Sequence, residues 1–302
     1  MRPVVRYVLR GVAAVIAAAG IGLLLFAQSE AHRLVTNPRA TRHQATSTPA
    51  DVHLPCENVT VTTADGLHLV GWYIPGQNHA AIIVQHGYKD SRSTMLGVAA
   101  LFARHGYGVL IDTVRAHDAS DGEVLTFGHL EMLDLDAWDR FLQSRFEVDP
   151  DRVGIFGASM GGALAIQFAA RTPRMRAVVS DAAYASVGGT IGTSVRFFTG
   201  LPPFPFAPLI QFFAEREAGF RTPDVDPVAS IGRISPRPVL ILQGGADAVI
   251  APDSGARLYA AADEPKQLWF EPTFGHVEFL AKAPAEFERR VVGFFDTYLL
   301  KP

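Results

Sequence analysis

The chain has 302 residues, of which 48% are hydrophobic and 19% charged, with a formal net charge of -3. This length allows one substantial core and lies at the upper end of what a single α/β domain uses. No basic stripe is interleaved with aromatic residues, so we expect no nucleic-acid partner. Cys56 is the only cysteine, which excludes an intramolecular disulfide and a cysteine-based metal site.

The N-terminus predicts a helix that enters a membrane. Three arginines precede an uncharged apolar run over residues 11–27, and a bilayer crossing takes roughly 17–25 such residues. A cleaved signal peptide has a similar layout, with residues 29–31 (Ser-Glu-Ala) as its cleavage site. We favour a retained anchor over residues 1–27, because the run is longer than the apolar part of a usual signal peptide.

The flanking charges favour one orientation only weakly. Arg2, Arg6 and Arg10 precede the run, and three further arginines follow it at positions 33, 39 and 42. Because the first three lie closer to the run and are joined by the terminal amine, we expect the N-terminus inside and the remaining chain outside the cytoplasm. A cleaved N-terminus would make the protein secreted. Residues 28–50 turn polar and rich in Thr, Pro and Arg, which predicts a linker before a folded domain over residues 51–302.

Beyond the linker, short apolar runs alternate with helical patterns. Residues 59–62 and 67–74, separated by Ala-Asp-Gly, predict an antiparallel hairpin. We expect further strands at residues 80–85, 108–112, 153–156, 177–180, 239–243 and 267–270. We expect helices at residues 94–104, 130–146, 160–171, 253–262 and 285–300. This order predicts an α/β fold with a mostly parallel sheet covered on both faces, whose ligands bind beyond the carboxyl ends of the strands.

The connection over residues 184–234 is longer than a strand-to-strand link needs. It is rich in aromatic and cyclic side chains, at Phe197, Phe198, Phe204, Phe206, Phe212, Phe213, Phe220, Pro202, Pro203, Pro205 and Pro208. The phenylalanines fit two interpretations: an aromatic lid for acyl chains, or side chains that pack this segment onto the body. We favour the packing interpretation.

A serine follows the predicted strand at residues 153–156. Residues 157–161 read Gly-Ala-Ser-Met-Gly, a G-x-S-x-G pattern, and an amphipathic helix follows. Small neighbours allow a sharp turn between strand and helix, which exposes the Ser159 hydroxyl above the sheet at a helix N-terminus. The pattern in this position predicts a nucleophile.

A serine hydroxyl needs a base that is itself held by an acid, and on this architecture they follow in the order Ser, Asp or Glu, His. The predicted strand at 239–243 is followed by Asp247, and the strand at 267–270 by His276, the last histidine of the chain. Asp253 and Glu271 are rivals for the acid, but Asp253 falls at a helix start, where aspartate commonly caps. We therefore predict Ser159, Asp247 and His276 as the catalytic residues.

An oxyanion hole requires two backbone N–H groups. One is expected from Met160, directly after the nucleophile, and the other from Tyr88, in the loop after the predicted strand at 80–85. The adjacent Gly87 allows a close approach of backbone to substrate. His86 is interpreted as a packing and hydrogen-bonding residue of that loop.

These motifs resemble the α/β-hydrolase superfamily over roughly residues 59–300. The similarity extends to its membrane-anchored Bem46-like and dienelactone-hydrolase-like branches, through VDPDRVGIFGASMGG, PVLILQGGADAVIAP and the FGH ending at His276. Residues 115–122 resemble the R-G-x-G-x-S-x-G loop of these proteins but carry Ala116 and Asp118 where glycines are usual. Glu131 and Asp134 match the helix that follows this loop, and we interpret both as structural.

The resemblance implies a serine hydrolase that cleaves an ester, thioester or amide through an acyl-enzyme, without metal or organic cofactor, most simply a carboxylesterase. It also implies that the segment at 184–234 is a cap over the site. An acyltransferase on the same residues, or a non-catalytic membrane-anchored binding protein on this fold, remains open. The expected partners are a small-molecule or lipid acyl substrate and the membrane, and the sequence leaves the substrate and the oligomeric state open.

Overall fold

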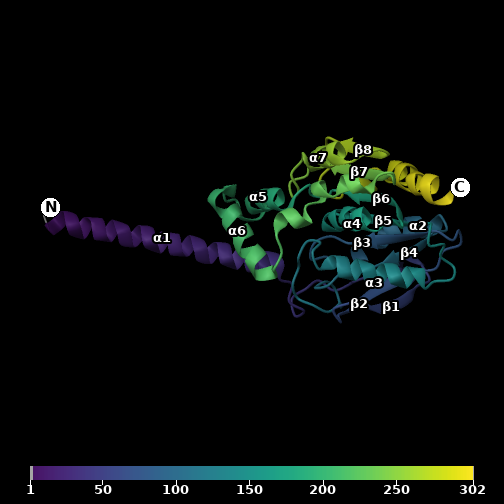
Figure 1. The fold of residues 1–302 in the computed structure, drawn as a ribbon, viewed down its shortest axis with the longest axis horizontal. Helices are drawn as coiled ribbons and strands as arrows, with labels where there is room; N and C mark the ends of the chain where they lie inside the picture. The colour runs from purple at the N-terminus through teal and green to yellow at the C-terminus, as the bar shows by residue number, and fades with distance from the viewer. Residues whose placement is uncertain (1–2, 302) are drawn as a thin grey trace.

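One eight-stranded sheet organises the protein in the computed structural model, which describes residues 3–301 (Figure 1). The strand order is β1-β2-β4-β3-β5-β6-β7-β8, antiparallel at β1–β2 and β2–β4 and parallel across the rest. The strands are β1 (Glu57–Thr62), β2 (His68–Ile74), β3 (Ala81–Gln85), β4 (Gly108–Ile111), β5 (Val153–Ala158), β6 (Met175–Asp181), β7 (Val239–Gly244) and β8 (Lys266–Glu271). The predicted mostly parallel sheet with its opening hairpin is confirmed.

Helices cover both faces of this sheet. The longer ones in the body are α2 (Leu96–Arg104), α3 (Glu131–Gln143), α4 (Met160–Arg171) and α7 (Ser254–Ala261). Near the C-terminus follow α8 (Phe279–Lys282), α9 (Pro284–Phe287) and α10 (Gly293–Phe295), with π-helical turns at Glu288–Val292 and Asp296–Leu300. Short 3-10 turns lie at Pro49–Val52 and Arg92–Met95.

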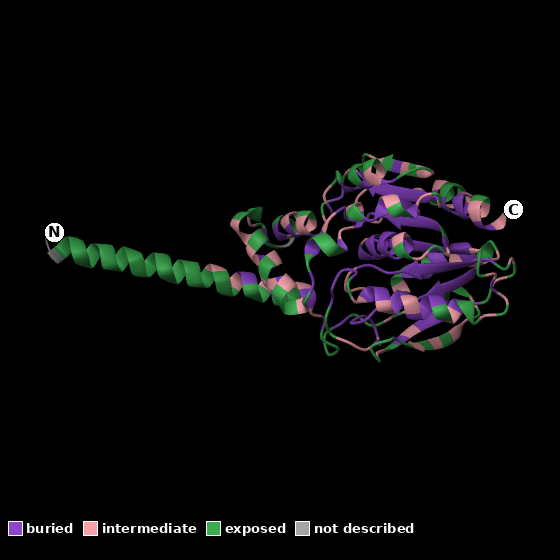
Figure 2. Ribbon diagram, in the orientation of Figure 1, coloured by how far each residue is buried: buried purple, intermediate pink, exposed green. Residues whose placement is uncertain are grey.

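The central strands are apolar on both sides because both of their faces are buried. All five residues of β3 are buried, whereas β1, at the sheet edge, alternates between partly buried and exposed residues. Along β3, Ile83 belongs to the core beneath α3 and α4, and Ile82 to the core beneath α2 and the C-terminal helix. Figure 2 shows the buried sheet between partly exposed helices. A continuous apolar strand is therefore the expected sequence signature.

The N-terminal helix α1 (Pro3–Val35) projects away from this body (Figures 1 and 2). It is long and apolar enough to cross a membrane by length and composition. The sequence interpretation ended the apolar helix at Ala27 and began a linker at Gln28, and this boundary is wrong, because the helix continues to Val35. Its last turns carry Ala27, Ala31 and Val35 at four-residue spacing, and this stripe is fully buried.

The remainder of the predicted linker is also docked rather than loose. Thr36 forms a bridge with Val124, and the Asn37 side chain donates to the carbonyl of Ala116 (2.7 Å). The buried Arg42 guanidinium donates to the carbonyls of Ser120 and Gly122, at 2.6 Å each, and the Gln44 amide donates to that of Asp118 (2.9 Å). These side chains satisfy carbonyl groups of the loop after β4, so residues 36–44 are part of the folded domain.

The segment between β6 and β7 forms the cap. It contains α5 (Val187–Thr199), α6 (Pro203–Ala218) and three 3-10 turns at Thr222–Val225, Pro227–Ala229 and Ile231–Ile234. The helices α1 and α6 pack side by side, with the rings of Phe26 and Phe206 edge to face at 5.5 Å (Figure 1).

Some of the cap phenylalanines pack the cap onto the body, and others remain exposed. Phe220 is buried, and Phe206 and Phe213 pack against the core, as the packing interpretation expects. Phe197, Phe204 and Phe212 remain exposed by 52%, 78% and 52%, so much of their surface is not used in packing the cap onto the body. The side chain of Phe198 lies outside the described part of the chain.

Candidate active site

Ser159 lies on the turn between β5 and α4. Its backbone adopts φ 55° and ψ -120°, a region that non-glycine residues rarely occupy. The turn is tight: a Cβ on Gly157 would lie 2.1 Å from the carbonyl oxygen of Gly161, and one on Gly161 would lie 2.4 Å from that of Gln85. Only glycine fits at these two positions, so the G-x-S-x-G pattern follows from steric limits of the turn.

Two loops at the carboxyl edge of the sheet bring Asp247 and His276 to this serine. His276 Nε2 lies 2.9 Å from Ser159 Oγ, and His276 Nδ1 lies 2.7 Å from Asp247 Oδ2. The other carboxylate oxygen of Asp247 accepts the N–H groups of Val249 (2.8 Å) and Ile250 (2.9 Å). Because a carboxylate only accepts hydrogen bonds, Nδ1 carries the proton and Nε2 is left to accept from the serine hydroxyl.

The rival acids lie elsewhere. Asp253 is exposed and directly precedes α7, and Glu271 accepts the indole N–H of Trp269 (2.9 Å). The loops that carry Asp247 and His276 are joined by a hydrogen bond from the N–H of Ala246 to the carbonyl of Phe274 (2.9 Å). The structure therefore brings together the three residues singled out from the sequence and leaves both alternatives apart.

The two predicted oxyanion donors border the same space as Ser159. Met160 is the first residue of α4, where backbone N–H groups have no partner within the helix. In the loop after β3, a Cβ on Gly87 would lie 3.4 Å from Ser159 Cβ, so Tyr88 follows a point of close approach. Within residues 3–301, neither the Met160 nor the Tyr88 N–H donates to a protein acceptor. Both N–H groups are thus available to a ligand.

Two buried histidines hold the loop that carries Tyr88. His117 Nε2 accepts the N–H of Lys89 (3.0 Å), while its Nδ1–H donates to the carbonyl of Arg115 (2.8 Å). His86 donates from Nδ1 to the carbonyl of Gly87 (2.8 Å), and the two rings lie 4.6 Å apart. Burial lowers the pKa of both histidines, because a charged imidazole is poorly solvated there. Both therefore stay neutral and serve the loop rather than a second base.

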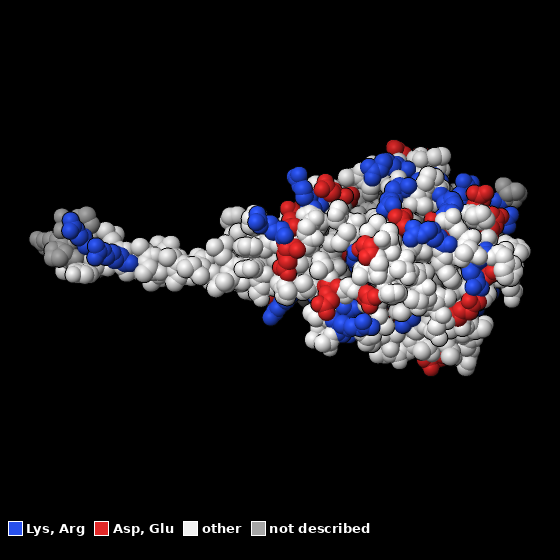
Figure 3. All heavy atoms as spheres, turned by 60° about the horizontal axis from the view of Figure 1, so that its bottom comes forward, with Lys and Arg blue, Asp and Glu red and all other residues white. Residues whose placement is uncertain are grey.

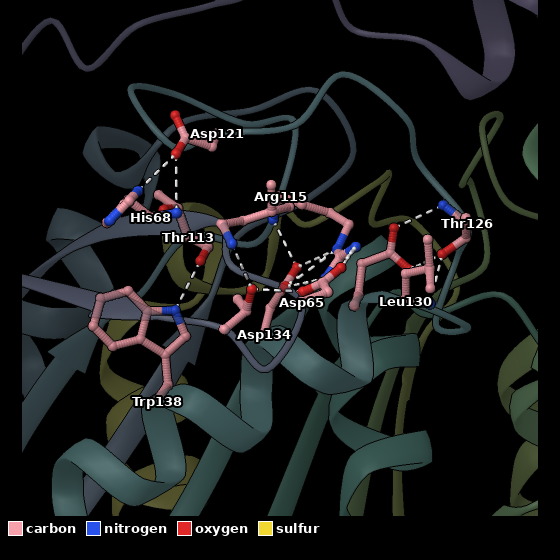
Figure 4. A network of polar contacts seen from close by, with 12 residues as sticks. Asp65, His68, Thr113, Arg115, Asp121, Thr126, Leu130, Asp134 and Trp138 are labelled. Atoms are coloured by element: carbon pink, nitrogen blue, oxygen red, sulfur yellow. Dashed lines mark hydrogen bonds and ion pairs between the residues drawn. The ribbon is translucent and has the colours of Figure 1, made fainter.

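A polar network fixes the loop after β4 that supports His117 (Figure 4). The guanidinium of Arg115 lies between two carboxylates, 2.8 Å from Asp134 and 2.8 Å from Asp65. The buried Glu131 accepts the N–H groups of Thr126 (2.7 Å) and Gly128 (2.8 Å). Glu131 and Asp134 thus hold backbone, in agreement with their structural interpretation.

Ala116 and Asp118, which replace the glycines usual in this loop, still adopt glycine-like backbone angles, with φ 61° and 49°. The Ala116 N–H donates to the carbonyl of Asp121 (2.9 Å), and the Asp118 carboxylate pairs with Arg92 (2.8 Å). These contacts offset the cost of a left-handed conformation, roughly 1–2 kcal/mol per residue. The departure from the family pattern therefore leaves the loop conformation intact.

An apolar cavity of about 340 Å³ adjoins Ser159. The wall includes Met160, Tyr88 and Val249, together with residues of α5 and the last turns of α1. The sequence interpretation missed the contribution of α1, whose Glu30, Arg33 and Leu34 line the cavity. The Tyr88 hydroxyl donates to the carbonyl of Leu34 (2.8 Å), and Lys89 Nζ donates to that of Arg33 (2.5 Å).

Asp181 is a second residue that the sequence did not single out. It ends β6, its carbonyl accepts the N–H of Ser159 (2.8 Å), and its carboxyl is 2% exposed with one oxygen unpartnered. Burial, with a further contribution from the charge of Asp247, raises the pKa of Asp181 to about 8. Asp181 is therefore protonated at neutral pH.

This pKa makes stability depend on pH through Asp181. In the unfolded chain an aspartate ionises near pH ~4, so between pH ~4 and about 8 the folded state holds one more proton. The free energy of unfolding should then fall as pH rises through this window, by at most ~1.4 kcal/mol per pH unit. Asp181→Asn cannot ionise and should show a flatter dependence.

The measurement is urea unfolding of the full chain in detergent micelles at pH 5 and pH 8. Asp151→Asn, which removes an exposed carboxylate, is the matched control and should retain the wild-type pH dependence. Identical dependence in wild type and Asp181→Asn would show that Asp181 ionises as readily in the folded protein as in the unfolded chain.

Comparisons with known proteins agree with this architecture. A family model described as serine aminopeptidase, S33, matches residues 76–209. The uncharacterised protein Rv2307c of Mycobacterium tuberculosis is 29% identical over 269 residues, covering 88% of this chain and 87% of its own length. The uncharacterised protein YqkD of Bacillus subtilis is 28% identical over 239 residues, 78% of each chain.

Solved structures match over the body as well. The esterase Pf2001 of Pyrococcus furiosus superimposes with a TM-score of 0.73 at 25% identity, covering 88% of this chain and 100% of that one. The residues matched by the family model include the serine turn at Ser159. The chain therefore has the α/β-hydrolase fold and is similar to hydrolases of the serine-hydrolase type.

Proposed function

We propose that this protein is a membrane-anchored serine hydrolase that cleaves carboxylic esters through an acyl-enzyme. The observation that carries the proposal is the continuous hydrogen-bonded chain from Ser159 Oγ through His276 to Asp247, with distances of 2.9 and 2.7 Å. Ser159 also lines an apolar cavity, which suits the acyl part of an ester better than a charged substrate. The esterase among the structural relatives supports the same reaction class.

The geometry supports the following steps. Ser159 Oγ attacks the ester carbonyl carbon while His276 Nε2 takes the hydroxyl proton, and the N–H groups of Met160 and Tyr88 stabilise the oxyanion. The C–O bond to the leaving alcohol then breaks, and His276 returns the proton to that alcohol. Water attacks the acyl-serine by the same route, releasing the acid and restoring the serine hydroxyl.

Asp247 has a positioning role in this scheme. The N–H groups of Val249 and Ile250 hold one of its oxygens, so the other is directed at His276 Nδ1. Its negative charge stabilises the imidazolium that forms when His276 accepts the serine proton.

We also propose that α1 is retained as a membrane anchor, with the catalytic domain outside the cytoplasm. Cleavage after residue 31 would remove Ala27 and Ala31, which are fully buried, and Glu30, which lines the cavity. The orientation rests on the basic residues before the apolar run. The intact mass of protein isolated from membranes, compared between a chain beginning at Met1 and one beginning at His32, decides between anchor and signal peptide.

The reaction is tested with the full chain in detergent micelles and p-nitrophenyl esters from acetyl to palmitoyl. We expect turnover of at least part of this series, and covalent labelling of Ser159 by a fluorophosphonate, located by peptide mass. Added glycerol separates hydrolysis from acyl transfer: a glyceryl ester as the main product would identify an acyltransferase. Folded protein that neither turns over an ester nor reacts with the fluorophosphonate would overturn the proposal and favour a non-catalytic binding protein.

A further inference from the structure

The cap and the N-terminal helix meet along a parallel contact. Phe26 of α1 packs on Phe206 of α6, and further along both helices His32 Nδ1 lies 2.5 Å from Glu217 Oε1. Residue numbers rise in the same direction along this contact, so the first residues of α6 lie toward the apolar part of α1. In Figure 1, α6 runs obliquely across the last part of α1.

Charged residues begin at the same level on both helices. On α1, residues 11–29 carry no charge, and the first charged residues after them are Glu30 and Arg33. On α6, residues 203–214 carry no charge, and residues 215–217 are all charged. Because Phe26 contacts Phe206 and His32 contacts Glu217, these two boundaries are aligned. Figure 3 shows the projecting helix as an uncharged stretch between basic side chains at its free end and mixed charges near the cap. Such an aligned boundary is what a membrane surface produces.

The uncharged end of α6 exposes large apolar side chains. Phe204, whose backbone is extended (φ -97°, ψ 134°) at a kink near the start of α6, is 78% exposed. Further along α6, Phe212 is 52% exposed, and the exposed Pro208 lies one helical turn before it. Contact with an apolar phase would remove the exposed parts of the two phenylalanine rings from water, which is favourable. The exposed Arg196 near the end of α5 is a residue type that reaches phosphate groups from an interface.

The cavity at Ser159 extends toward this same end of the cap. Its α5 wall is formed by residues 190, 191, 194, 195 and 199, which share one helical face along most of α5. Thr199 is the last residue of α5, directly before the turn into α6. A volume of about 340 Å³ lies near the lower end of the ~300–1,000 Å³ found for small-molecule pockets, so the cavity suits one acyl chain.

We propose that the α5–α6 hairpin is a second membrane-contacting element, which dips into the bilayer surface beside α1. The cavity then leads from Ser159 to the bilayer, and the substrate is an amphiphile with a single acyl chain drawn from it. This substrate class rests on the proposed function, whereas the bilayer contact does not.

The bilayer contact is tested in the full chain, reconstituted into phosphatidylcholine–phosphatidylglycerol vesicles with or without bromine on the acyl chains. We expect the emission added by Phe204→Trp to shift to shorter wavelength in vesicles and to be quenched by the brominated lipid. The native tryptophans, Trp72, Trp138 and Trp269, are buried in the body and give the background to subtract.

Phe146→Trp is the matched control. Phe146 is 99% exposed and follows α3, which returns the chain to the amino edge of the sheet, opposite the cap. We expect no bromine quenching at this position. Equal emission of Phe204→Trp in both vesicle types would overturn the bilayer contact.

The path of the acyl chain is tested by narrowing the far end of the cavity with Thr199→Trp. Thr199 is exposed, so the larger side chain can be accommodated without disturbing the core. We expect the ratio of kcat/KM for decanoyl over butyryl p-nitrophenyl esters to fall at least about tenfold, the discrimination that one mismatched methylene supplies in an apolar pocket. Thr193→Trp adds the same bulk to α5 at a residue that does not line the cavity, and it should keep the wild-type ratio.

An unchanged ratio in Thr199→Trp would overturn the path along α5. Absence of turnover with every ester in the wild type would instead overturn the proposed function and with it the substrate class. The quenching result does not depend on catalysis, so the two failures are distinguishable.

Discussion

Replacing Ser159 with alanine is expected to lower kcat for p-nitrophenyl ester hydrolysis by on the order of 10⁶, where chemistry limits turnover. The Ser159 hydroxyl, 2.9 Å from His276 Nε2, forms the acyl-enzyme in the proposed mechanism, and alanine removes it without adding volume. The measurement is a steady-state and burst-phase comparison of wild type and variant in the same micelles.

Ser186→Ala is a suitable control, because it removes a hydroxyl that caps α5 outside the proposed catalytic chain. We expect its thermal unfolding to change more than its chemistry. Retention of more than a small fraction of wild-type turnover by a folded Ser159→Ala protein would show that the ester is cleaved elsewhere.

Asp247→Asn is expected to lower kcat by on the order of 10⁴. The N–H groups of Val249 and Ile250 both donate to one side-chain oxygen, so the asparagine oxygen should take that place. Its NH₂ would then face His276 Nδ1 and force the proton onto Nε2. In that tautomer the imidazole cannot accept the serine proton.

Asp253→Asn tests the rival acid and should leave kcat near the wild-type value, because Asp253 is exposed at the start of α7. The double variant Asp247→Asn with Ser159→Ala should be no slower than Ser159→Ala alone, since residues that act as a unit are not additive. If Asp253→Asn lowered kcat more than Asp247→Asn does, Asp253 would be the acid in place of Asp247.

The sheet and the close placement of Ser159, Asp247 and His276 were predictable because their signals are local. The first four of the five buried residues of β3 form one apolar run. The serine turn needs glycine at positions 157 and 161 for steric reasons that any sequence with this turn must satisfy. Asp247 and His276 follow strands, and parallel strands bring their carboxyl ends to one edge. Order along the chain was therefore enough to select them.

The parts that the sequence did not reveal depend on partners far along the chain. Arg42 donates to the carbonyls of Ser120 and Gly122, and backbone carbonyls leave no mark in a sequence. The continuation of α1 to Val35 depends on a stripe of Ala27, Ala31 and Val35, which is buried in a core cluster formed by residues far along the chain. The composition of residues 28–35 predicts a polar segment, because the buried stripe is narrow and its residues are mostly small.

The unbroken course of α1 fixes the position of Ser159 relative to the apolar run. A flexible tether would let Ser159 search a volume whose radius is set by the length of the chain. Here the chain is helical from the apolar run to Val35, and the side chains of Tyr88 and Lys89 donate to carbonyls in the last turn of that helix. The distance between Ser159 and the end of the apolar run is therefore fixed. Inserting or deleting residues in α1 between Ala27 and Val35 would therefore alter reach and the cavity wall together, so anchor length and active-site shape cannot vary independently.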